Sequence, residues 1–513
     1  MSGEAKSANV GEELASGHAD NEGLAATCDE SWFSRKRLFT TGFGVHSLLA
    51  LTMIFMLARG FKHAPDLFVG PHAFDSADVA TTARTFATLG VLRLHAIPIN
   101  NNPPVIRSDA YTHWPPLLPI VLSFVFRAFG SSERTVHLFM LAVFAATALL
   151  IYLLARAWLN STAAALAALF WMVLPVELQF GDISVQQPFA VLFLLAALLA
   201  LERHRGLAGV LFFLAVCSSW EAALIGPAFW IMAKRYPELK LNARVALLAC
   251  TTGLFLVAAL FLFGNPKAAL DTIQTAKFYM GVSHTYSAVS SPALQNQLSL
   301  GEQIRLTLLN NFWMLGPLGL GAVLQLILRR PRPIFEKLAP LGIVWLVWCV
   351  AMNNHTARHP FELVIAAPTV AIAMAWLASP EFHSGVGTRG IQQFVFVALA
   401  VAQAVLLPVP RMSDGYDPFK LVQYARDIKS ATEPNSIVLA PLVSAVPLYY
   451  SERHIIRGID SPAEASNILP QLSREFPGSP VYLALPPELV TSFGENDAQA
   501  VTTRGSAVIF RLK

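Results

Sequence analysis

The sequence predicts a polytopic α-helical membrane protein that carries a small C-terminal α/β domain. Hydrophobic residues make up 54% of its 513 residues and charged residues only 14%, whereas soluble domains carry about 25% charged residues. Apolar runs of near-spanning length recur up to about residue 410, and short strand and helix patterns alternate after it. The chain therefore divides into a tail over 1–37, a membrane domain over 38–410 and an α/β domain over 411–513.

The first 34 residues are small, polar and acidic, and they lack the early apolar core of a signal peptide. A segment of this composition buries too little apolar surface to fold, so we expect a disordered tail. The basic cluster Arg35-Lys36-Arg37 stands directly before the first span. Because basic residues that flank a span stay on the cytosolic side, the tail is expected in the cytosol.

About eleven spans are expected from the apolar runs. Several runs are short, which is typical of helices that pack inside a bundle rather than against lipid. The candidate spans lie near 38–58, 135–155, 162–176, 186–201, 207–218, 221–233, 244–263, 308–328, 338–352, 361–378 and 391–408.

One apolar stretch, from Pro115 to Gly130, decides on which side of the membrane each later loop lies. It holds about 14 apolar residues, a length that fits a helix on the membrane surface better than a crossing helix. If it does not cross, the basic clusters fall on the cytosolic side, and three short outer loops together hold one basic residue, Arg358. The first outer loop then covers 59–134, and the short outer loops are 177–186, 218–221 and 353–360.

The C-terminal segment alternates two periodicities, which is the pattern of a small α/β domain. Helices are expected over Asp417–Ser430 and Ser461–Phe476, with strands at 436–440, 480–485 and 507–512. With eleven spans and a cytosolic N-terminus, this domain lies outside the cytoplasm.

Two carboxylates, Asp75 and Asp78, open the first outer loop. Ionised groups beside lipid are costly and therefore mark functional sites. Asp75 could instead cap a helix over Ser76–Leu89, with Asp78 at its third position, and both would then be structural. In the functional interpretation, Asp75 is a general base that takes a proton from an acceptor hydroxyl as it attacks a sugar carbon. Partial burial would raise the pKa of Asp75 and make it a better base.

Other polar residues collect on the same side of the membrane. His113 stands before two prolines at the lip of the interfacial helix, where it is either structural or part of a site. Arg134 closes the first outer loop, where a surface anchor or a phosphate clamp could sit. Asp182 and Glu221 lie in two of the short outer loops, and Glu221 is expected near the membrane surface.

The late outer loop places Arg358 between two histidines, His355 and His359. Arginine offers a planar fork of donors that suits phosphate oxygens, and the histidines could assist as donors. A solvated loop with no role is the alternative. The two histidines lack an evident third ligand, so no metal site is expected here.

Composition excludes several classes of function. No basic block alternates with aromatic residues, so nucleic acid is not an expected partner. The four cysteines form neither a disulfide framework nor a metal-ligand spacing. One face of the membrane thus collects carboxylates, histidines, an arginine and a folded domain, which is the layout of a site that handles a polar head attached to a lipid.

The segment from Asp75 to Gly90 resembles the acidic first loop of GT-C glycosyltransferases, most closely the protein O-mannosyltransferase type and the bacterial lipid A aminoarabinose transferases. The next segment is similar to their HPPL…FG-x-SE-x-x-R stretch, and Tyr152-Leu-Leu-Ala-Arg156 is similar to the end of the following span. His355–Pro368 resembles their late loop. The residues of the second match are Tyr111-Thr-His-Trp-Pro-Pro-Leu-Leu-Pro and Phe129-Gly-Ser-Ser-Glu-Arg134.

The resemblance implies a hexosyl- or pentosyltransferase that uses a polyprenyl-phosphate sugar, inverts the anomeric centre and needs no metal or other cofactor. It implies Asp75 as the catalytic base and Asp78 as a second candidate, although the family's acidic pair is adjacent and here Ser76 follows Asp75. His113 occupies the family's histidine position with Trp114 inserted before the prolines. The family's later aspartate corresponds loosely to Asp182 or to the Gln186-Gln187 pair.

The partners implied are the lipid-linked donor, membrane lipids, and a lipid, glycan or protein acceptor, in the inner membrane of a bacterium. A transporter or flippase for lipid-linked glycans is the alternative, but it should show inverted repeats and helices broken at mid-membrane, and the sequence shows neither. A non-catalytic membrane scaffold would leave Asp75 explained only as a helix cap.

Overall fold

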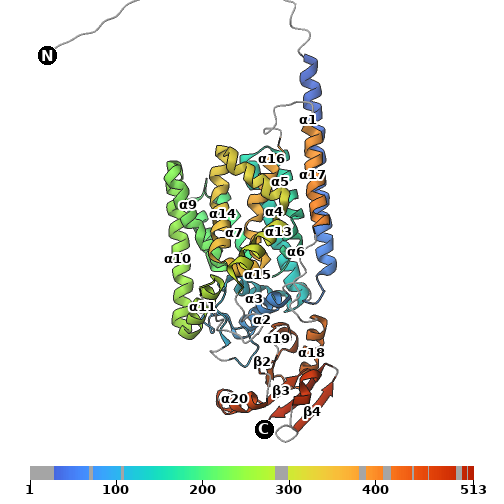
Figure 1. Ribbon diagram of the computed structural model, residues 1–513, viewed down its shortest axis with the longest axis vertical. Coiled ribbons are helices and arrows are strands. Elements are labelled where there is room, and N and C mark those ends of the chain that lie inside the picture. The colour runs from blue at the N-terminus through green and yellow to red at the C-terminus, as the bar shows by residue number, and fades with distance from the viewer. Residues whose placement is uncertain are drawn as a thin grey trace, which may run out of the picture.

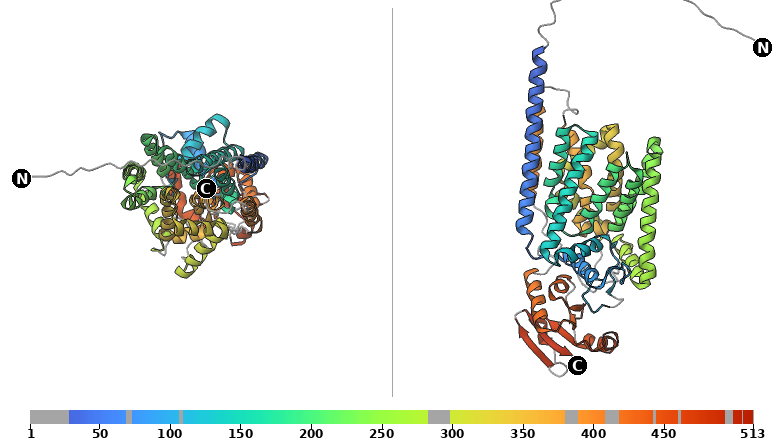
Figure 2. Two further views of the ribbon diagram at one scale, coloured as in Figure 1. Left: turned by 90° about the horizontal axis from the view of Figure 1, so that it is seen from above. Right: turned by 180° about the vertical axis from the view of Figure 1, so that it is seen from behind.

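The computed structural model is a bundle of roughly parallel helices with a small sheet domain at one end (Figure 1). The two further views agree that the sheet lies beyond the bundle rather than beside it (Figure 2). The structure describes residues 28–68, 73–105, 109–282, 298–379, 389–407, 418–441, 444–459, 462–492, 499–504 and 506–512.

Five of the described helices are long and apolar enough to cross a membrane, which confirms a polytopic helical membrane protein. The count of about eleven spans remains a prediction, because the other apolar helices are 10–17 residues long. The bundle helices are α1 (Cys28–His63), α4 (Glu133–Trp158), α5 (Ser161–Val173), α7 (Gln186–Ala200), α8 (Arg205–Ser218), α9 (Ile225–Arg235), α10 (Lys240–Gly264), α13 (Leu300–Arg329), α14 (Arg332–Ala351), α16 (Ala367–Leu377) and α17 (Arg389–Leu406).

Close packing in the bundle core depends on small residues. Alanine is the commonest residue of helix α5, and ten of the residues of this helix are buried, from Ala163 to Met172. Gly226 of α9 lies so close to α10 that a Cβ atom there would meet the Cα atom of Leu247 at 2.9 Å. Small side chains let helix backbones approach closely inside lipid, where packing rather than water exclusion drives association.

Ion pairs link three connections between bundle helices at one end of the bundle. These are the connections from α7 to α8, from α9 to α10 and from α13 to α14. Arg332 at the start of α14 contacts Glu238 at 2.7 Å in the connection from α9 to α10. Lys337 contacts Glu202, which follows α7. The basic loops that the sequence assigned to the cytosolic side therefore lie together.

The opposite end of the bundle, called here the loop end, faces the sheet domain (Figure 1). Its elements are α2 (Ala73–Leu89), α3 (Leu117–Phe129), α6 (Pro175–Phe180), the 3-10 helix η2 (Trp220–Leu224), α11 (Pro266–Tyr279), α15 (Asn353–Arg358) and the 3-10 helix η4 (Pro360–Ile365). Most of them lie in or beside the predicted outer loops, whereas α11 follows the predicted span 244–263 and η4 begins the run 361–378 that was predicted as a span.

The C-terminal residues form a five-stranded sheet of order β2-β1-β3-β5-β4. β1 is parallel to β2 and β3, whereas β5 is antiparallel to β3 and β4. The elements are α18 (Pro418–Ala431), β1 (Ile437–Ala440), α19 (Val446–Ser451), β2 (His454–Arg457), α20 (Pro462–Glu475), β3 (Val481–Leu485), β4 (Gln499–Arg504) and β5 (Ala507–Leu512).

Several boundaries differ from those that the sequence predicts. Helix α1 begins at Cys28, so residues 28–37 are helical rather than part of a disordered tail, because an existing helix extends at little cost. Residues 1–27 of that tail lie outside the described residues. The sequence analysis also missed α19, β2 and β4. Helix α19 is only six residues long, and β4 is mostly polar, so neither shows a clear periodicity.

Candidate functional site

The two aspartates of the first loop occupy different environments. Helix α2 begins at Ala73, so Asp75 lies inside the first turn and Asp78 lies in the next turn. Asp75 therefore does not take the cap position before Ser76 that the structural alternative gave it. Asp75 is partly exposed, whereas Asp78 is only 9% exposed. Only Asp75 thus combines a carboxylate with access from the surface.

Asp78 is held between the first loop and the sheet domain. The Asn100 side-chain amide donates a hydrogen bond to Oδ1 of Asp78. Burial raises the pKa of Asp78 from 3.8 to about 6, against the opposing charge of Arg457 on β2, while the charge of Asp75 adds to the rise. Asp78 therefore lies in the buried contact between the first outer loop and the sheet domain.

The two asparagines that follow Asn100 attach the sheet domain to the loop end. Asn101 donates from Nδ2 to the carbonyl of Ile455 at 3.0 Å, and its Oδ1 accepts from the Ile455 N–H at 3.0 Å. Asn102 donates to the carbonyls of Leu448 and Arg453 at 2.7 and 3.1 Å. These amides satisfy buried backbone groups that would otherwise lack partners.

A second buried cluster forms below the late outer loop around Glu362. The carboxyl group of Glu362 accepts from Nε2 of Gln187 at 3.1 Å and from Nε1 of Trp348 at 2.5 Å. Nδ1 of His355 lies 3.2 Å from Oε1 of the same carboxyl. Burial, and then the charges of Glu221 and Asp75, raise the pKa of Glu362 well above its ordinary value. Asp75 therefore lies within electrostatic reach of this cluster as well as of Asp78.

Glu221 of η2 belongs to the same cluster. Its side chain is fully buried and accepts a hydrogen bond from the Ser219 hydroxyl, and its charge acts on Glu362. Burial raises the pKa of Glu221. That Glu221 lies near the membrane surface and takes part in substrate binding stays a prediction.

His355, Arg358 and His359 lie on or directly after the short helix α15. The ring of His355 lies 4.1 Å from the ring of Tyr279 and 4.6 Å from that of His359. Arg358 is half-buried, and its Nε donates to Asn354 at 3.3 Å. Its guanidinium carbon stands 5.8 Å from the Phe278 ring centre. Desolvation lowers the pKa of Arg358, and the charge of Tyr279 opposes that effect.

His113 lies next to this group but is held by α11. Its Nε2 lies 3.4 Å from Oδ2 of Asp271 and 3.3 Å from the Thr275 hydroxyl. Its backbone carbonyl accepts from the Trp220 indole at 2.6 Å. The next residue, Trp114, stacks on His355 at 5.7 Å between ring centres. The first loop, η2, α11 and α15 therefore meet at one place.

Two of the predicted residues lie apart from this meeting place. Arg134 is exposed in the first turn of α4. Asp182 lies near His137 of the same helix, because its charge acts on that histidine. Neither shares a described contact with the cluster around Glu362.

The sequence analysis missed Glu362 and Tyr279. Glu362 lies inside the run 361–378 that was predicted as a span, and an acidic residue within an apolar run is itself a signal of function. Tyr279 ends α11, which lies between the predicted spans 244–263 and 308–328, and the sequence analysis singled out no residue of that interval. Among the described residues, no group of three or more His, Cys, Asp and Glu side chains is arranged to hold a metal ion.

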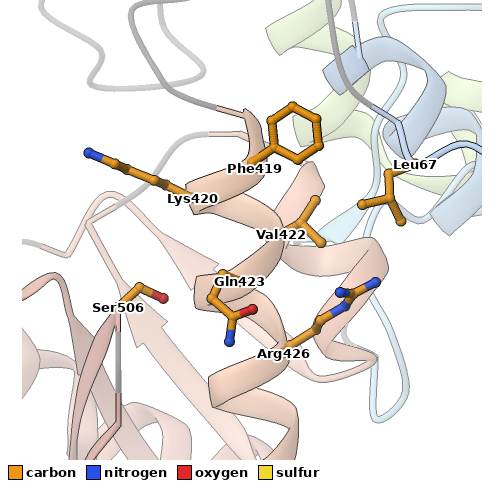
Figure 3. Close-up of a pocket in the computed structure, with 7 residues that line it drawn as sticks. All are labelled: Leu67, Phe419, Lys420, Val422, Gln423, Arg426 and Ser506. Atoms are coloured by element: carbon orange, nitrogen blue, oxygen red, sulfur yellow. The ribbon is translucent and has the colours of Figure 1, made fainter.

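A surface hollow of about 380 Å³ lies elsewhere, between the segment after α1 and helix α18 (Figure 3). It contains none of the predicted site residues. Its lining consists of Leu67, Phe419, Lys420, Val422, Gln423, Arg426 and Ser506.

Residues 113–263 match the family model described as dolichyl-phosphate-mannose-protein mannosyltransferase. The chain resembles the crystal structure of ArnT from Cupriavidus metallidurans bound to undecaprenyl phosphate, with a TM-score of 0.59, 13% identity, and coverage of 91% of this chain and 98% of that chain. It also resembles the apo oligosaccharyltransferase of Archaeoglobus fulgidus, with a TM-score of 0.50, 13% identity, and coverage of 87% and 69%. No curated protein matched the chain. The resemblance seen in the sequence is therefore confirmed for the fold.

Proposed function

We propose that this chain, which has the fold of the GT-C glycosyltransferases, moves a sugar from a polyprenyl-phosphate donor to an acceptor at the outer face of the membrane. The observation that carries this proposal is the convergence of the first loop, η2, α11 and α15 at the loop end. Asp75 lies within electrostatic reach of that cluster. Asp75 is a partly exposed carboxylate, and the half-buried Arg358 lies one helical turn after His355 of the same cluster; a base and a phosphate-binding cation are the two groups that sugar transfer from a phosphate needs.

In the proposed reaction, an acceptor hydroxyl attacks the anomeric carbon from the face opposite the phosphate. The bond from that carbon to the phosphate oxygen breaks, and the polyprenyl phosphate leaves with the bonding electron pair. Asp75 accepts the hydroxyl proton during the attack, and the single displacement inverts the anomeric centre. Asp75 is the better candidate base, because Asp78 already binds Asn100 in a buried position.

Arg358 and the histidines beside it are suited to the donor phosphate. Desolvation strengthens the attraction between a guanidinium group and phosphate oxygens, and Arg358 is half-buried beside Phe278 and Tyr279. The relative ArnT was solved with undecaprenyl phosphate, which supports a lipid phosphate as the leaving group here. In this proposal Glu221 and His113 hold in place the elements that border the site. Arg134 and Asp182 lie on the surface next to it.

The gathering of the basic loops at the end opposite the sheet domain supports a cytosolic placement of that end. The loop end and the sheet domain then lie on the outer side of the membrane. We place the helix bundle in the inner membrane of a bacterium. The reaction as written needs no metal ion, because the leaving phosphate is a monoester that Arg358 can neutralise.

The test is Asp75→Asn in membranes supplied with labelled lipid-phosphate sugars. We expect transfer to fall by a factor of about 10² or more, the usual contribution of a general base, with donor binding retained. Asp182→Asn is the matched control, since Asp182 is also a partly exposed loop carboxylate but lies apart from the cluster. Full activity of Asp75→Asn would remove Asp75 from the mechanism, and donor crossing the membrane without transfer would favour a flippase.

A further inference from the structure

The surface hollow beside α18 lies at the level where the helix bundle leaves the membrane. The apolar part of α1, from Phe43 to His63, has 21 residues, which extend for about 31 Å and match the hydrocarbon core of a bilayer, about 30 Å thick. Leu67 of the hollow follows four residues after His63, which allows at most about 14 Å of chain. Headgroups begin directly beyond the core, so the hollow borders the headgroup layer.

The bundle surface next to the hollow faces lipid. None of the residues in the most apolar stretch of α1 is buried, and Phe55 and Phe61 are largely exposed there. Val405 and Leu406 at the end of α17 are largely exposed as well. Helices α1 and α17 both pack against α5, and α18 lies beyond their lower ends (Figure 1). A lipid whose acyl chains cover this apolar surface therefore has its headgroup at the hollow.

The hollow has an apolar side and a basic side. Phe419 and Val422 lie on the side of α18 that faces Leu67, and Arg426 extends from the same side (Figure 3). Lys420 extends from the opposite side of the helix start (Figure 3). The volume of about 380 Å³ lies in the usual range of ligand sites, about 300–1,000 Å³. The hollow can therefore hold a phosphate group and the glycerol carbons next to it.

The two basic groups of the hollow lack an acidic partner within the described part of the chain. Arg426 and Lys420 are exposed, and no hydrogen bond or ion pair to a described residue involves either side chain. The adjacent carboxylate of Asp427 is buried and accepts from the N–H and hydroxyl of Ser506 at 3.0 and 2.9 Å and from Gln423 at 2.9 Å. The hollow therefore presents net positive charge, which favours an anionic ligand.

We propose that this hollow binds an anionic glycerophospholipid of the leaflet that meets the loop end. Its phosphate lies at Arg426 and Lys420, and its acyl chains continue along the apolar side of the hollow toward α1. The planar fork of Arg426 suits two phosphate oxygens, and the flexible lysine adds a point charge at the rim. The bound lipid ties α18, and with it the sheet domain, to the membrane surface. This inference goes beyond the proposed sugar transfer and does not rest on it.

The first experiment measures lipid binding to the full-length protein by native mass spectrometry. Arg426→Gln and Lys420→Gln should each weaken the binding of phosphatidylglycerol about fivefold, the usual effect of one basic residue near an anionic lipid surface, and the double variant about 25-fold. Wild type and variant are compared in one spectrum, so lipids bound elsewhere on the bundle cancel. Equal affinity of the wild type and the double variant for phosphatidylglycerol would overturn the proposal.

Lys429→Gln is the matched control for the loss of one positive charge. Lys429 lies on the same helix but is paired with Glu452 at 2.7 Å, so its replacement should leave phosphatidylglycerol binding unchanged. Phosphatidylethanolamine carries its own ammonium group, and its weaker binding should be the same in all variants. A loss in Lys429→Gln as large as that in Arg426→Gln would show a general effect of charge and would contradict a defined site.

A crosslinking experiment locates the lipid. The full-length protein is placed in nanodiscs that contain phosphatidylglycerol with a photoreactive group beside the glycerol. Crosslinks are expected within residues 418–431 or 64–67, and they should be absent from the double variant Lys420→Gln/Arg426→Gln and retained in Arg426→Lys. Crosslinks in these segments that persist at the wild-type yield in the double variant would refute the role of the two cations.

Competition distinguishes the proposed lipid from other phosphates. Unlabelled phosphatidylglycerol should remove the crosslink, whereas excess inorganic phosphate and equimolar undecaprenyl phosphate should leave it in place. Displacement by inorganic phosphate would assign the hollow to a soluble anion, and displacement by undecaprenyl phosphate would assign it to a polyprenyl carrier; either result would overturn the proposal. None of these measurements depends on sugar transfer, so a failure here leaves the proposed function untouched.

Discussion

Replacement of Asp78 by asparagine should stabilise the protein at neutral pH. Asparagine has nearly the same shape, and its side-chain oxygen can accept the hydrogen bond that Asn100 donates to Asp78. The pKa of Asp78 rises from 3.8 to about 6 because burial disfavours the charged form more than Arg457 and Asn100 favour it. A rise of about two pKa units corresponds to about 3 kcal/mol of destabilisation once the group is ionised.

The sign of the pH dependence follows from the raised pKa. Below about pH 4 the carboxyl is protonated in both the folded and the unfolded chain, and its favourable contribution to stability is complete. That contribution is lost as pH rises through about 6, when the native carboxyl ionises in its buried position. The advantage of Asp78→Asn should therefore be greatest at pH 7–8, about 3 kcal/mol, and should shrink toward pH 5.

The assay is thermal and denaturant unfolding in detergent micelles from pH 5 to pH 8, followed by tryptophan fluorescence. Asp78→Ala is the control, because it removes the acceptor of the Asn100 bond and should be less stable than Asp78→Asn at every pH. A variant Asp78→Asn that is less stable than the wild type at pH 8, or whose stability difference is the same at pH 5 and pH 8, would refute the reasoning. Retained transfer activity in the same variant would assign Asp78 to structure rather than to catalysis.

Two further predictions concern the donor and the sheet domain. Arg358→Ala should weaken donor binding about tenfold or more, since it removes a charge-assisted contact worth about 1.5–3 kcal/mol. Arg358→Lys should retain only part of the wild-type donor affinity. Unchanged donor affinity of Arg358→Ala in a binding titration would reject the phosphate role. Asn102→Ala leaves two buried carbonyls without their donor and should lower the stability of the attachment by about 1–3 kcal/mol. This loss should appear as faster hydrogen exchange in β2. The control Asn160→Ala, at the cap of α5, should not change that exchange.

Much of the bundle could be predicted because its signals are local. Apolar runs near 135–155 and 244–263 became α4 and α10, since a span must satisfy its own backbone hydrogen bonds and therefore forms a helix wherever the run is long enough. The strands at 480–485 and 507–512 were likewise found by their composition. The six-residue helix α19 and the strand β4 could not be read, because the first is too short to show a period and the second has no apolar run.

The candidate site was predicted as a set of loops rather than as a geometry. The sequence indicated Asp75, Glu221 and Arg358, but only the family resemblance, and no physical property of the two positions, ranked Asp75 above Asp78. Their difference depends on Asn100 and on Arg457, which lies far along the chain on β2. Glu362 was absorbed into a predicted span, and only its contacts with Gln187 and Trp348 mark it as part of a polar cluster.

The amino-acid sequence by itself determined that the chain enters the membrane, which loops carry acids and which carry bases, and where a mixed domain follows the last span. Hydrophobicity and charge are properties of each segment by itself, so membrane spans and loop charges can be predicted segment by segment along the chain. Only the tertiary structure decided which carboxyl is exposed, which is sealed and which imidazole nitrogen faces Glu362. Burial and hydrogen-bond partners come from residues hundreds of positions apart, as between Asn101 and Ile455, and no local pattern contains them.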